Sequence, residues 1–320
     1  MRSLFGAIAV AACIAGAVPA QAELRQITIG TNPSGTIAHV LGSGVAKLLQ
    51  EKLGIRSTVE PHGGTSSYVP LLAQGELTLG IFIGVELGLA VKGQAPYTEP
   101  VKGVAPIARL MNLEYAFVAR ADSGLKTVAD LKGKTVVVGI KSNIVLEKVN
   151  ELMLATAGLS PSDVTATDAG GLGQGLAAVT EGRAEAAPIG LGIPALRQAD
   201  ASTPGGMRVL ALGDKATNEF AESQLSGARV VTSEPSPRNV GVDAPIPVIG
   251  LELFVNAGPT VSDEDAYRIA KTIYENWATL QEEIPALRRF SRDDLGLQPT
   301  PVPYQPGAER FYREIGLHKN

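Results

Sequence analysis

Cysteine, aromatic side chains and excess positive charge are all scarce in this chain of 320 residues. Its single cysteine, Cys13, lies in a leader that we expect to be removed. The mature chain would then hold no disulfide, thiolate metal site or cysteine nucleophile. Aromatic residues make up 5% of the chain, and 28 basic residues stand against 32 acidic ones. Because a nucleic-acid surface needs basic patches and stacking platforms, we expect no nucleic-acid partner.

Long apolar runs are also rare. Residues 4–18 form the run near the N-terminus, which follows Arg2 and leads to Ala20-Gln21-Ala22, a small-residue cleavage motif. This pattern predicts a secretory signal peptide at residues 1–22, cleavage after Ala22 and a periplasmic mature protein. A lipoprotein site at Cys13 is the weaker alternative, because it would leave an apolar mature N-terminus. No later run approaches the roughly 18 residues that a membrane span requires.

Strands and helices alternate along the rest of the sequence. Three strands are each followed by a turn and a helical pattern, at residues 26–31, 56–61 and 77–83. Further strands are expected at residues 134–140, 165–171, 184–192 and 208–213, and a capped amphipathic helix at residues 262–281. This alternation predicts a mostly parallel α/β sheet, whose ligands bind outside the carboxyl ends of the strands.

The order of these segments predicts two lobes joined by a hinge. Strands near residues 116–120 and 251–256 would cross from one lobe to the other. We expect the first part of lobe 1 at residues 23–117, an inserted lobe 2 at 118–250, and a return strand with C-terminal helices on lobe 1 at 251–320. A cleft that shuts on a ligand is the expected mechanism of such a clamp.

A turn of small residues, Gly63-Gly64-Thr65-Ser66-Ser67, separates the second strand from its helix. It would present backbone N–H groups and hydroxyls at a helix N-terminus, which suits an anion. It also suits an ordinary helix cap. The turns at residues 32–36 and 83–86 follow neighbouring strands and would meet it at the same edge of the sheet. This placement favours the anion-binding interpretation.

Two cations accompany these turns. Arg109 lies in an apolar segment, where an idle charge would be costly, and its guanidinium could hold a carboxylate in a bidentate contact. An equally open alternative is that the Arg109 side chain reaches the surface or pairs with an acid such as Glu114. Lys141 stands between a strand end and a helix cap, where it could contact a ligand or be solvated. Turns and cations together favour a small organic anion.

Several motifs are too incomplete to support other chemistry. Gly133-Lys134-Thr135 lacks the upstream glycine of a phosphate-binding P-loop and leads into a strand, and residues 169–179 lack the third glycine of a dinucleotide fingerprint. His39, His62 and His318 are not at metal-ligand spacing, although His62 could reach the cleft. We therefore assign no catalytic residue, no metal site and no cofactor.

Four stretches carry a resemblance to a known family. They are ITIGTNPSGTIAHVLGSGVAKLLQ, VEPHGGTSSYVPLLAQGELTLGIF, VARADSGLKTVADLKGKTVVVGI and AVTEGRAEAAPIGLGIPA. In their order and in the Gly-Gly-Thr-Ser turn, the chain resembles the solute receptors of TRAP transporters of the TAXI type (TRAP-associated extracytoplasmic immunogenic proteins). The resemblance implies a type II periplasmic binding protein fold, no catalysis, and delivery of a solute to a membrane permease with a small and a large subunit.

Members of this family often bind glutamate, 2-oxoglutarate or related carboxylates. The contact positions that the resemblance implies fall on Asn32, Ser34, Gly35, Thr36, Gly64, Thr65, Ser66, Phe82, Gly84, Lys141, Ser142, Asn143 and Gly190. With Arg109, these are the predicted ligand-binding residues. We expect the receptor to be a monomer and its ligand to be a glutamate-like, 2-oxoglutarate-like or dicarboxylate solute.

The sequence departs from the family pattern at two turns. The first lacks the paired tyrosines that usually follow it, and the third reads Ile83-Gly84-Val85-Glu86 in place of a polar run. Such losses should shift ligand preference sharply, so we do not name the solute, and whether Glu86 lines the cleft is left open. The alternatives are a periplasmic receptor for a membrane sensor and, less favoured, an exported enzyme on the same scaffold.

Overall fold

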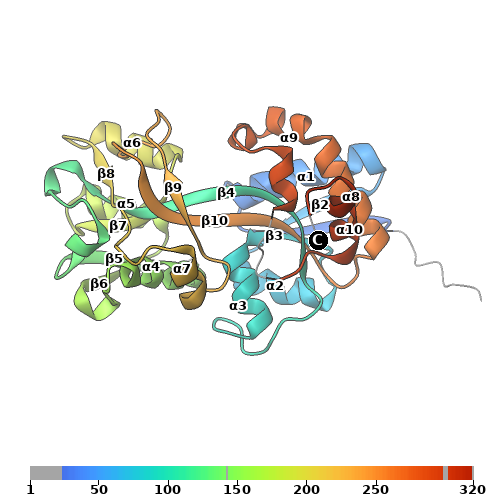
Figure 1. The fold of residues 1–320 in the computed structure, drawn as a ribbon, viewed down its shortest axis with the longest axis horizontal. Coiled ribbons are helices and arrows are strands. Elements are labelled where there is room, and N and C mark those ends of the chain that lie inside the picture. Colours follow the sequence, from blue (N-terminus) through green and yellow to red (C-terminus); the bar gives the residue numbers. More distant parts are fainter. Residues whose placement is uncertain (1–23, 142, 298–301, 319–320) are drawn as a thin grey trace, which may run out of the picture.

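The computed structural model describes residues 24–141, 143–297 and 302–318. The predicted signal peptide at residues 1–22 and the predicted contact residue Ser142 lie outside the described residues. Figure 1 shows two lobes joined by two long antiparallel strands, β4 (Ala105–Arg120) and β10 (Ile246–Ala257). The expected two-lobed α/β fold with two crossing strands is therefore confirmed. The exact lobe boundaries stay predictions, because both strands run through both lobes.

One sheet of ten strands extends through the molecule in the order β2-β1-β3-β10-β4-β7-β5-β6, with β8 beside β4 and β9 beside β10. The parallel strands of lobe 1 are β1 (Gln26–Thr31), β2 (Arg56–Pro61) and β3 (Leu79–Ile83). Those of lobe 2 are β5 (Thr135–Ile140), β6 (Thr165–Ala169) and β7 (Ala186–Gly190). The remaining strands are β8 (Met207–Val209) and β9 (Arg229–Ser233).

The carboxyl ends of the parallel strands in each lobe point toward the other lobe. Ile83, the last residue of β3, pairs with Leu253 of β10, whereas Leu79 at its start pairs with Ala257. Gly190, the last residue of β7, pairs with Tyr115 in the second half of β4. Because β4 and β10 cross between the lobes, the loops that follow the parallel strands face one another at the junction.

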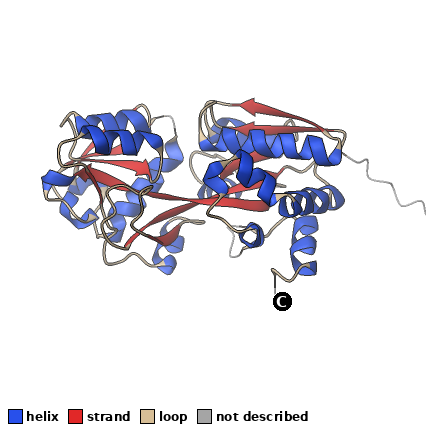
Figure 2. Cartoon of the chain, turned by 90° about the horizontal axis from the view of Figure 1, so that it is seen from above, coloured by secondary structure: helices blue, strands red, loops and turns tan. Residues whose placement is uncertain are grey.

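Helices cover both faces of the sheet in each lobe (Figure 2). In lobe 1, α1 (Ile37–Leu53), α2 (Thr65–Gln74) and α3 (Gly84–Lys92) follow β1, β2 and β3. The C-terminal helices of this lobe are α8 (Asp263–Glu275), α9 (Trp277–Glu283) and α10 (Pro306–Glu314). In lobe 2, α4 (Ile144–Thr156), α5 (Leu172–Thr180) and α6 (Pro194–Ser202) follow β5, β6 and β7, and α7 (Asn218–Gln224) precedes β9.

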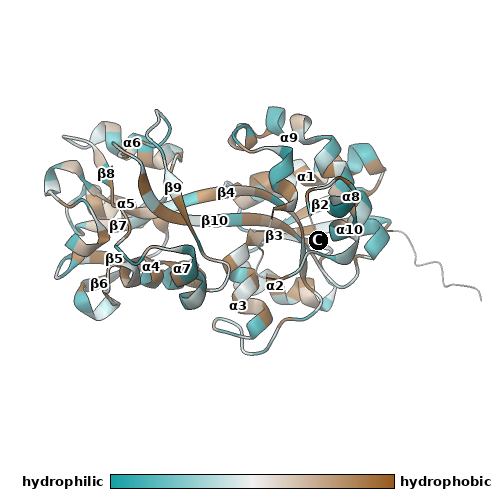
Figure 3. Ribbon diagram, viewed as in Figure 1, coloured by the Kyte–Doolittle hydropathy of each residue, from teal (hydrophilic) through white to brown (hydrophobic). Residues whose placement is uncertain are grey.

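Two hydrophobic clusters form the core. One lies in lobe 1 beneath α1, α8 and α10 and contains Leu41 and Tyr312. The other begins under α2 and α3 with Tyr68, continues through Tyr115 on β4, and reaches Met153 in lobe 2. Hydrophilic residues gather on the outer helices α8 and α10 (Figure 3). Because the second cluster contains residues of both lobes, the crossing strands belong to a packed core rather than to a loose linker.

Some elements differ from the sequence-based expectation. The helix expected at residues 262–281 is interrupted at Asn276, where α8 ends and α9 begins. The Asn276 side chain donates to the Thr272 carbonyl at 2.9 Å, a local bond through which asparagine competes with regular helix. The strand expected at residues 208–213 shortens to β8, and α7 and β9 occupy a segment for which no regular structure was predicted.

Candidate ligand site between the lobes

Most helices that begin at the lobe junction lack side-chain caps. In α2, α3, α4 and α5 no side chain of the described residues accepts a hydrogen bond from the first turn; their N-cap residues are Gly64, Ile83, Asn143 and Gly171. In α1, by contrast, the Thr36 hydroxyl accepts from the His39 N–H at 3.3 Å. Uncapped first turns leave backbone N–H groups free, and these carry the positive end of the helix dipole.

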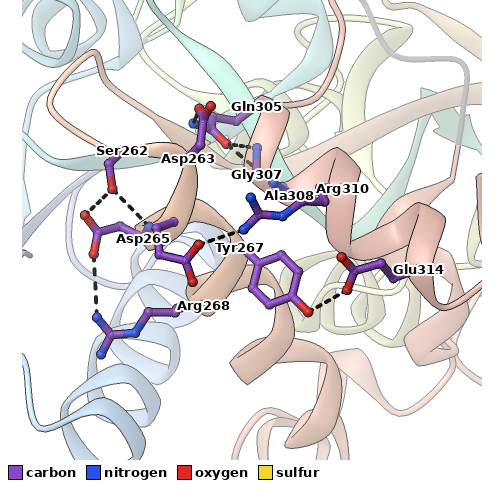
Figure 4. A network of polar contacts seen from close by, with 11 residues as sticks. Ser262, Asp263, Asp265, Tyr267, Arg268, Gln305, Gly307, Ala308, Arg310 and Glu314 are labelled. Atoms are coloured by element: carbon purple, nitrogen blue, oxygen red, sulfur yellow. Dashed lines mark hydrogen bonds and ion pairs between the residues drawn. The ribbon is translucent and has the colours of Figure 1, made fainter. Parts of the chain in front are cut away.

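Three helices that begin away from the junction, α7, α8 and α10, have side-chain caps, whereas α9 has none. Figure 4 shows the Ser262 hydroxyl accepting from the Asp265 N–H at 3.1 Å at the start of α8. The Gln305 side-chain oxygen accepts from the Gly307 N–H at 2.6 Å at the start of α10. In α7 the Thr217 hydroxyl caps the helix in the same way. The sequence therefore supplies caps at these three distant helix ends and omits them at five junction helices, since α6 (N-cap Ile193) also lacks one.

A cavity of about 270 Å³ joins two of the uncapped helices, α2 from lobe 1 and α4 from lobe 2. Its lining consists of Gly63, Gly64, Thr65, Ser66, Ser67, Pro96, Lys141, Asn143, Ile144 and Val145. The structure thus brings the predicted contact residues of the Gly-Gly-Thr-Ser turn together with Lys141 and Asn143. Their contact with a ligand stays a prediction.

The lobe 2 wall of this cavity offers a cation, an amide and an apolar surface. The Lys141 side chain is 71% exposed, and its ammonium lies 3.9 Å from the Asp168 carboxylate, a weak surface pair. The Asn143 side-chain oxygen is buried and has no hydrogen-bond partner among the described residues. Ile144 is 51% exposed in the same turn. This wall could therefore contact both the charged and the apolar part of a solute.

Glu86 lies behind the cavity rather than in it. It is fully buried, and its carboxylate accepts hydrogen bonds from the Thr65 hydroxyl at 2.6 Å and from the Tyr97 hydroxyl. Burial raises the pKa of the Glu86 carboxyl, although both hydrogen bonds oppose this shift. Because the Thr65 hydroxyl donates its hydrogen bond to Glu86, Thr65 can donate to a ligand through its backbone N–H but not through its hydroxyl.

Other predicted contact residues lie outside this cavity. Asn32, Ser34, Gly35 and Thr36 form the turn between β1 and α1, in which the Thr36 hydroxyl donates to the Pro33 carbonyl at 2.8 Å. The Asn32 side-chain oxygen is buried without a partner among the described residues. These residues share the junction edge with the cavity, but they do not line it.

Phe82, Gly84 and Gly190 are buried in the present structure. Phe82 is 1% exposed and packs edge-on against Tyr68, with ring centroids 6.1 Å apart, so it is a core residue rather than a surface contact. Gly84 begins α3 and Gly190 ends β7. A Cβ at Gly190 would lie 3.4 Å from the Leu113 side chain, which indicates close packing at the end of β7.

The structure separates Arg109 from the cavity. Because β4 begins at Ala105, Arg109 lies within the sheet, and its Nε is 3.3 Å from the Glu252 carboxylate on β10. The two side chains are 16% and 10% exposed. The alternative of an acidic partner therefore agrees with the structure, but the partner is Glu252 rather than Glu114. Burial raises the pKa of Glu252, and Arg109 opposes that shift.

Sequence reasoning missed a group of arginines at the same junction. Arg197, Arg238 and Arg289 come from three distant segments and approach the end of β7 and the middle of β4. No local pattern in the sequence links them. Among the described residues no group of three or more histidine, cysteine or acidic side chains could hold a metal ion. None of the described helices is long and apolar enough to cross a membrane.

Three solved structures show the same fold at low sequence identity. PhnD1 from Prochlorococcus marinus, in complex with methylphosphonate, is 12% identical over 92% of this chain and 99% of that chain, with a TM-score of 0.56. XAC2383 from Xanthomonas citri bound to ATP is 14% identical over 91% and 99%, with a TM-score of 0.54. The periplasmic aliphatic sulphonate binding protein SsuA from Escherichia coli is 16% identical over 92% and 94%, with a TM-score of 0.51.

These likenesses show an α/β fold of the type II periplasmic binding proteins. No protein of curated function matches the chain in sequence. A family model described as the NMT1-like family matches residues 29–316, which include both lobes and both crossing strands. The chain therefore belongs to the NMT1-like family.

Proposed function

We propose that this protein is a periplasmic solute receptor whose two lobes close on a small organic anion. One observation carries the proposal: the uncapped N-termini of α2 and α4, one from each lobe, line the same cavity as Lys141. Each helix N-terminus is equivalent to roughly half a positive charge. A single anion between them would satisfy backbone N–H groups of both lobes at once.

Binding between two helix ends couples affinity to lobe closure. A ligand shifts a conformational equilibrium only by its differential affinity for the two states. An anion that contacts both α2 and α4 can make its full set of hydrogen bonds only when the lobes hold those helices together. The closed arrangement is therefore the one that the anion stabilises, which is the behaviour of a two-lobed clamp.

The solute class that we propose is a small carboxylate, glutamate-like, 2-oxoglutarate-like or a dicarboxylate. The resemblance to TAXI receptors supports a carboxylate. The proteins of similar fold are described with methylphosphonate and as binding aliphatic sulphonate, which are also small organic oxyanions. The shared chemistry is an oxyanion head group on a small organic body, in keeping with a cavity of about 270 Å³ whose wall includes the exposed Ile144.

We propose that the receptor delivers its solute to the two membrane subunits of a TRAP permease. This assignment rests on the resemblance of the Gly-Gly-Thr-Ser turn and its neighbouring segments to TAXI receptors. The competing assignment is a receptor that reports to a membrane sensor through the same ligand site. A permease or a sensor kinase encoded beside the gene would separate these two partners. Removal of residues 1–22 during export belongs to the same proposal.

A thermal-shift screen of the chain from Glu23 onward tests the proposal. The panel holds mono-, di- and tricarboxylates, methylphosphonate, methanesulfonate, and neutral and cationic solutes. A solute at 100 times its dissociation constant adds about 2.7 kcal/mol to the free energy of unfolding, which raises Tm by roughly 5 °C in a chain of this size. We expect shifts with organic anions and recovery of the solute unchanged. A shift confined to neutral or cationic solutes, or conversion of the solute, would overturn the proposal.

A further inference from the structure

Three arginines converge at the lobe junction, around the turn that follows β7 and the middle of β4. Arg197 lies in α6, Arg238 lies in the loop between β9 and β10, and Arg289 follows α9 in lobe 1. We call them the arginine cluster. The cluster therefore contains cations from both lobes, just as the cavity is lined by helix N-termini from both lobes.

Two members of the cluster rest on the turn that follows β7. The Arg197 guanidinium donates to the Gly192 carbonyl at 2.8 Å. A Cβ at Gly192 would lie 2.5 Å from Arg238 Nε, so Arg238 occupies space that only glycine leaves open. Gly192 also has a φ of +73°, which favours glycine. Glycine at position 192 thus allows two cationic side chains, Arg197 and Arg238, to approach this turn closely.

The third member ties the cluster to the hinge. Arg289 donates to the Glu114 carboxylate at 3.0 Å and to the Asn112 carbonyl at 2.9 Å, both on β4. The other Glu114 oxygen accepts from the Ser233 hydroxyl at 2.6 Å and from the Asn239 amide at 2.9 Å. Glu114 therefore links a lobe 1 arginine to lobe 2 side chains, and both of its oxygens are already engaged.

The positive charge of the cluster exceeds the negative charge beside it. Burial lowers the pKa of the Arg238 guanidinium, and the charges of Arg289 and Arg197 lower it further; Glu114 is the acid that opposes them. Arg238 Nε is buried and has no hydrogen-bond partner among the described residues. Three guanidinium groups thus lie near one carboxylate, which is ion-paired with Arg289, and Arg238 keeps a donor without a partner among the described residues.

The cluster and the cavity lie at neighbouring strand ends. Lys141 follows β5 and Gly192 follows β7, and these two strands are adjacent and parallel in the sheet. Adjacent strands are about 4.8 Å apart. The Leu191 N–H, in the turn that carries Gly192, donates to the Glu114 carbonyl at 2.8 Å. A solute that spans the edge of the sheet could therefore place one end at α2 and α4 and the other at the arginines.

We propose that the arginine cluster is a second oxyanion subsite of the interlobe site, and that the receptor selects solutes with two anionic groups. The inference rests on the proposed function and names the residues that would hold the second anionic group of such a solute. Guanidinium groups suit carboxylate, phosphonate or sulfonate oxygens because they donate in a planar fork. An anion held by Arg289 from lobe 1 and Arg238 from lobe 2 also joins the lobes, and it relieves the repulsion between their charges.

Paired probes of one chain length test the inference: succinate, with two carboxylates, against butyrate, with one. Titration calorimetry would use the chain from Glu23 onward, its Arg238→Gln variant, and Arg288→Gln as the control. Arg288 is an exposed neighbour of Arg289, and its guanidinium donates to the Gln281 carbonyl at 3.2 Å, away from Glu114. We expect wild type to bind succinate at least about tenfold more tightly than butyrate, the value of one charged hydrogen bond. Arg238→Gln should remove that preference and Arg288→Gln should keep it.

Stability at low salt gives a second readout that needs no organic ligand. Removing one of three crowded charges should leave Arg238→Gln at least as stable as wild type in dilute buffer. Added sulfate should stabilise wild type more than Arg238→Gln, whereas chloride at equal ionic strength should not distinguish them.

Equal affinity for succinate and butyrate, or equal loss of both in Arg238→Gln, would overturn the inference while leaving the proposed function intact. Binding of none of succinate, butyrate and sulfate would also overturn it, and the broader solute screen would then decide the proposed function separately.

Discussion

Two arginine regions near the crossing strands differ in how their charge is balanced. Arg109 faces Glu252 within the sheet, with both side chains largely buried, and Arg229 and Glu222 stand nearby, so two cations balance two acids. In the arginine cluster three cations surround one acid, Glu114, which forms an ion pair with Arg289. Both regions hold a buried Nε without a hydrogen-bond partner among the described residues, on Arg109 and on Arg238, so the difference lies in the charge balance alone. A matched pair is what structural burial of charge requires. An unmatched group at the same junction is what an anion site requires, so charge balance, rather than burial alone, separates the two roles.

The largest effect should come from breaking the matched pair. Arg109→Gln leaves Glu252 buried without its main cation, which should lower the free energy of unfolding by about 2–3 kcal/mol. Because the substitution removes a group that lowers the Glu252 pKa, the loss should grow as pH rises above the usual range of a glutamate. Chemical denaturation at several pH values measures it. Affinity for organic anions should not change.

The matched control for that substitution is Arg183→Gln. Arg183 also pairs with a carboxylate, that of Glu181, but the two side chains are 62% and 57% exposed. Exposed pairs contribute roughly 0–1 kcal/mol. Equal destabilisation by the two substitutions would contradict the distinction between a buried matched pair and a surface pair.

Removing the buried acid behind the cavity should have a smaller, pH-dependent effect. The pKa of Glu86 is raised in the folded state, so the native protein holds this proton more tightly than the unfolded chain. The associated stability is present below the unfolded pKa and is lost as pH rises through the folded pKa. Glu86→Gln should abolish that loss, giving a flatter dependence of Tm on pH. An unchanged pH profile would show that Glu86 does not titrate in this way.

The smallest effect on stability, but a clear one on binding, should come from Lys141. Lys141→Gln should weaken binding of organic anions about tenfold, equivalent to about 1.4 kcal/mol, with Tm nearly unchanged because the side chain is exposed. Lys134→Gln is the matched control, since Lys134 also lies 3.9 Å from a carboxylate, that of Glu185, at the opposite end of β5. Equal loss in both variants would place the role of Lys141 outside the cavity.

Local patterns were sufficient to predict the fold and residues on both walls of the cavity. Each strand–turn–helix unit carries its own signal, and parallel strands bring the turns that follow them to one edge. The Gly-Gly-Thr-Ser turn and Lys141 therefore came together as expected. The break at Asn276 had a signal as well, because asparagine within a helix can bond to the local backbone.

The charges depended on contacts that no local pattern specifies. Arg109 meets Glu252 only because β4 and β10 are neighbours in the sheet. Arg197, Arg238 and Arg289 come together from an inserted helix, a long loop and the C-terminal segment. In the sequence, each of these arginines looks like an ordinary surface residue. The local surplus of positive charge at the lobe junction arises only when folding brings the three together.

Hydrogen exchange of backbone amides tests the central claim that an anion bridges two uncapped helices from opposite lobes. The measurement compares the protein with and without the anion that gives the largest thermal shift, peptide by peptide. The account predicts slower exchange in the first turns of both α2 and α4, and little change in the capped first turns of α7, α8 and α10. Protection in one lobe alone, or equal protection of capped and uncapped helices, would contradict it.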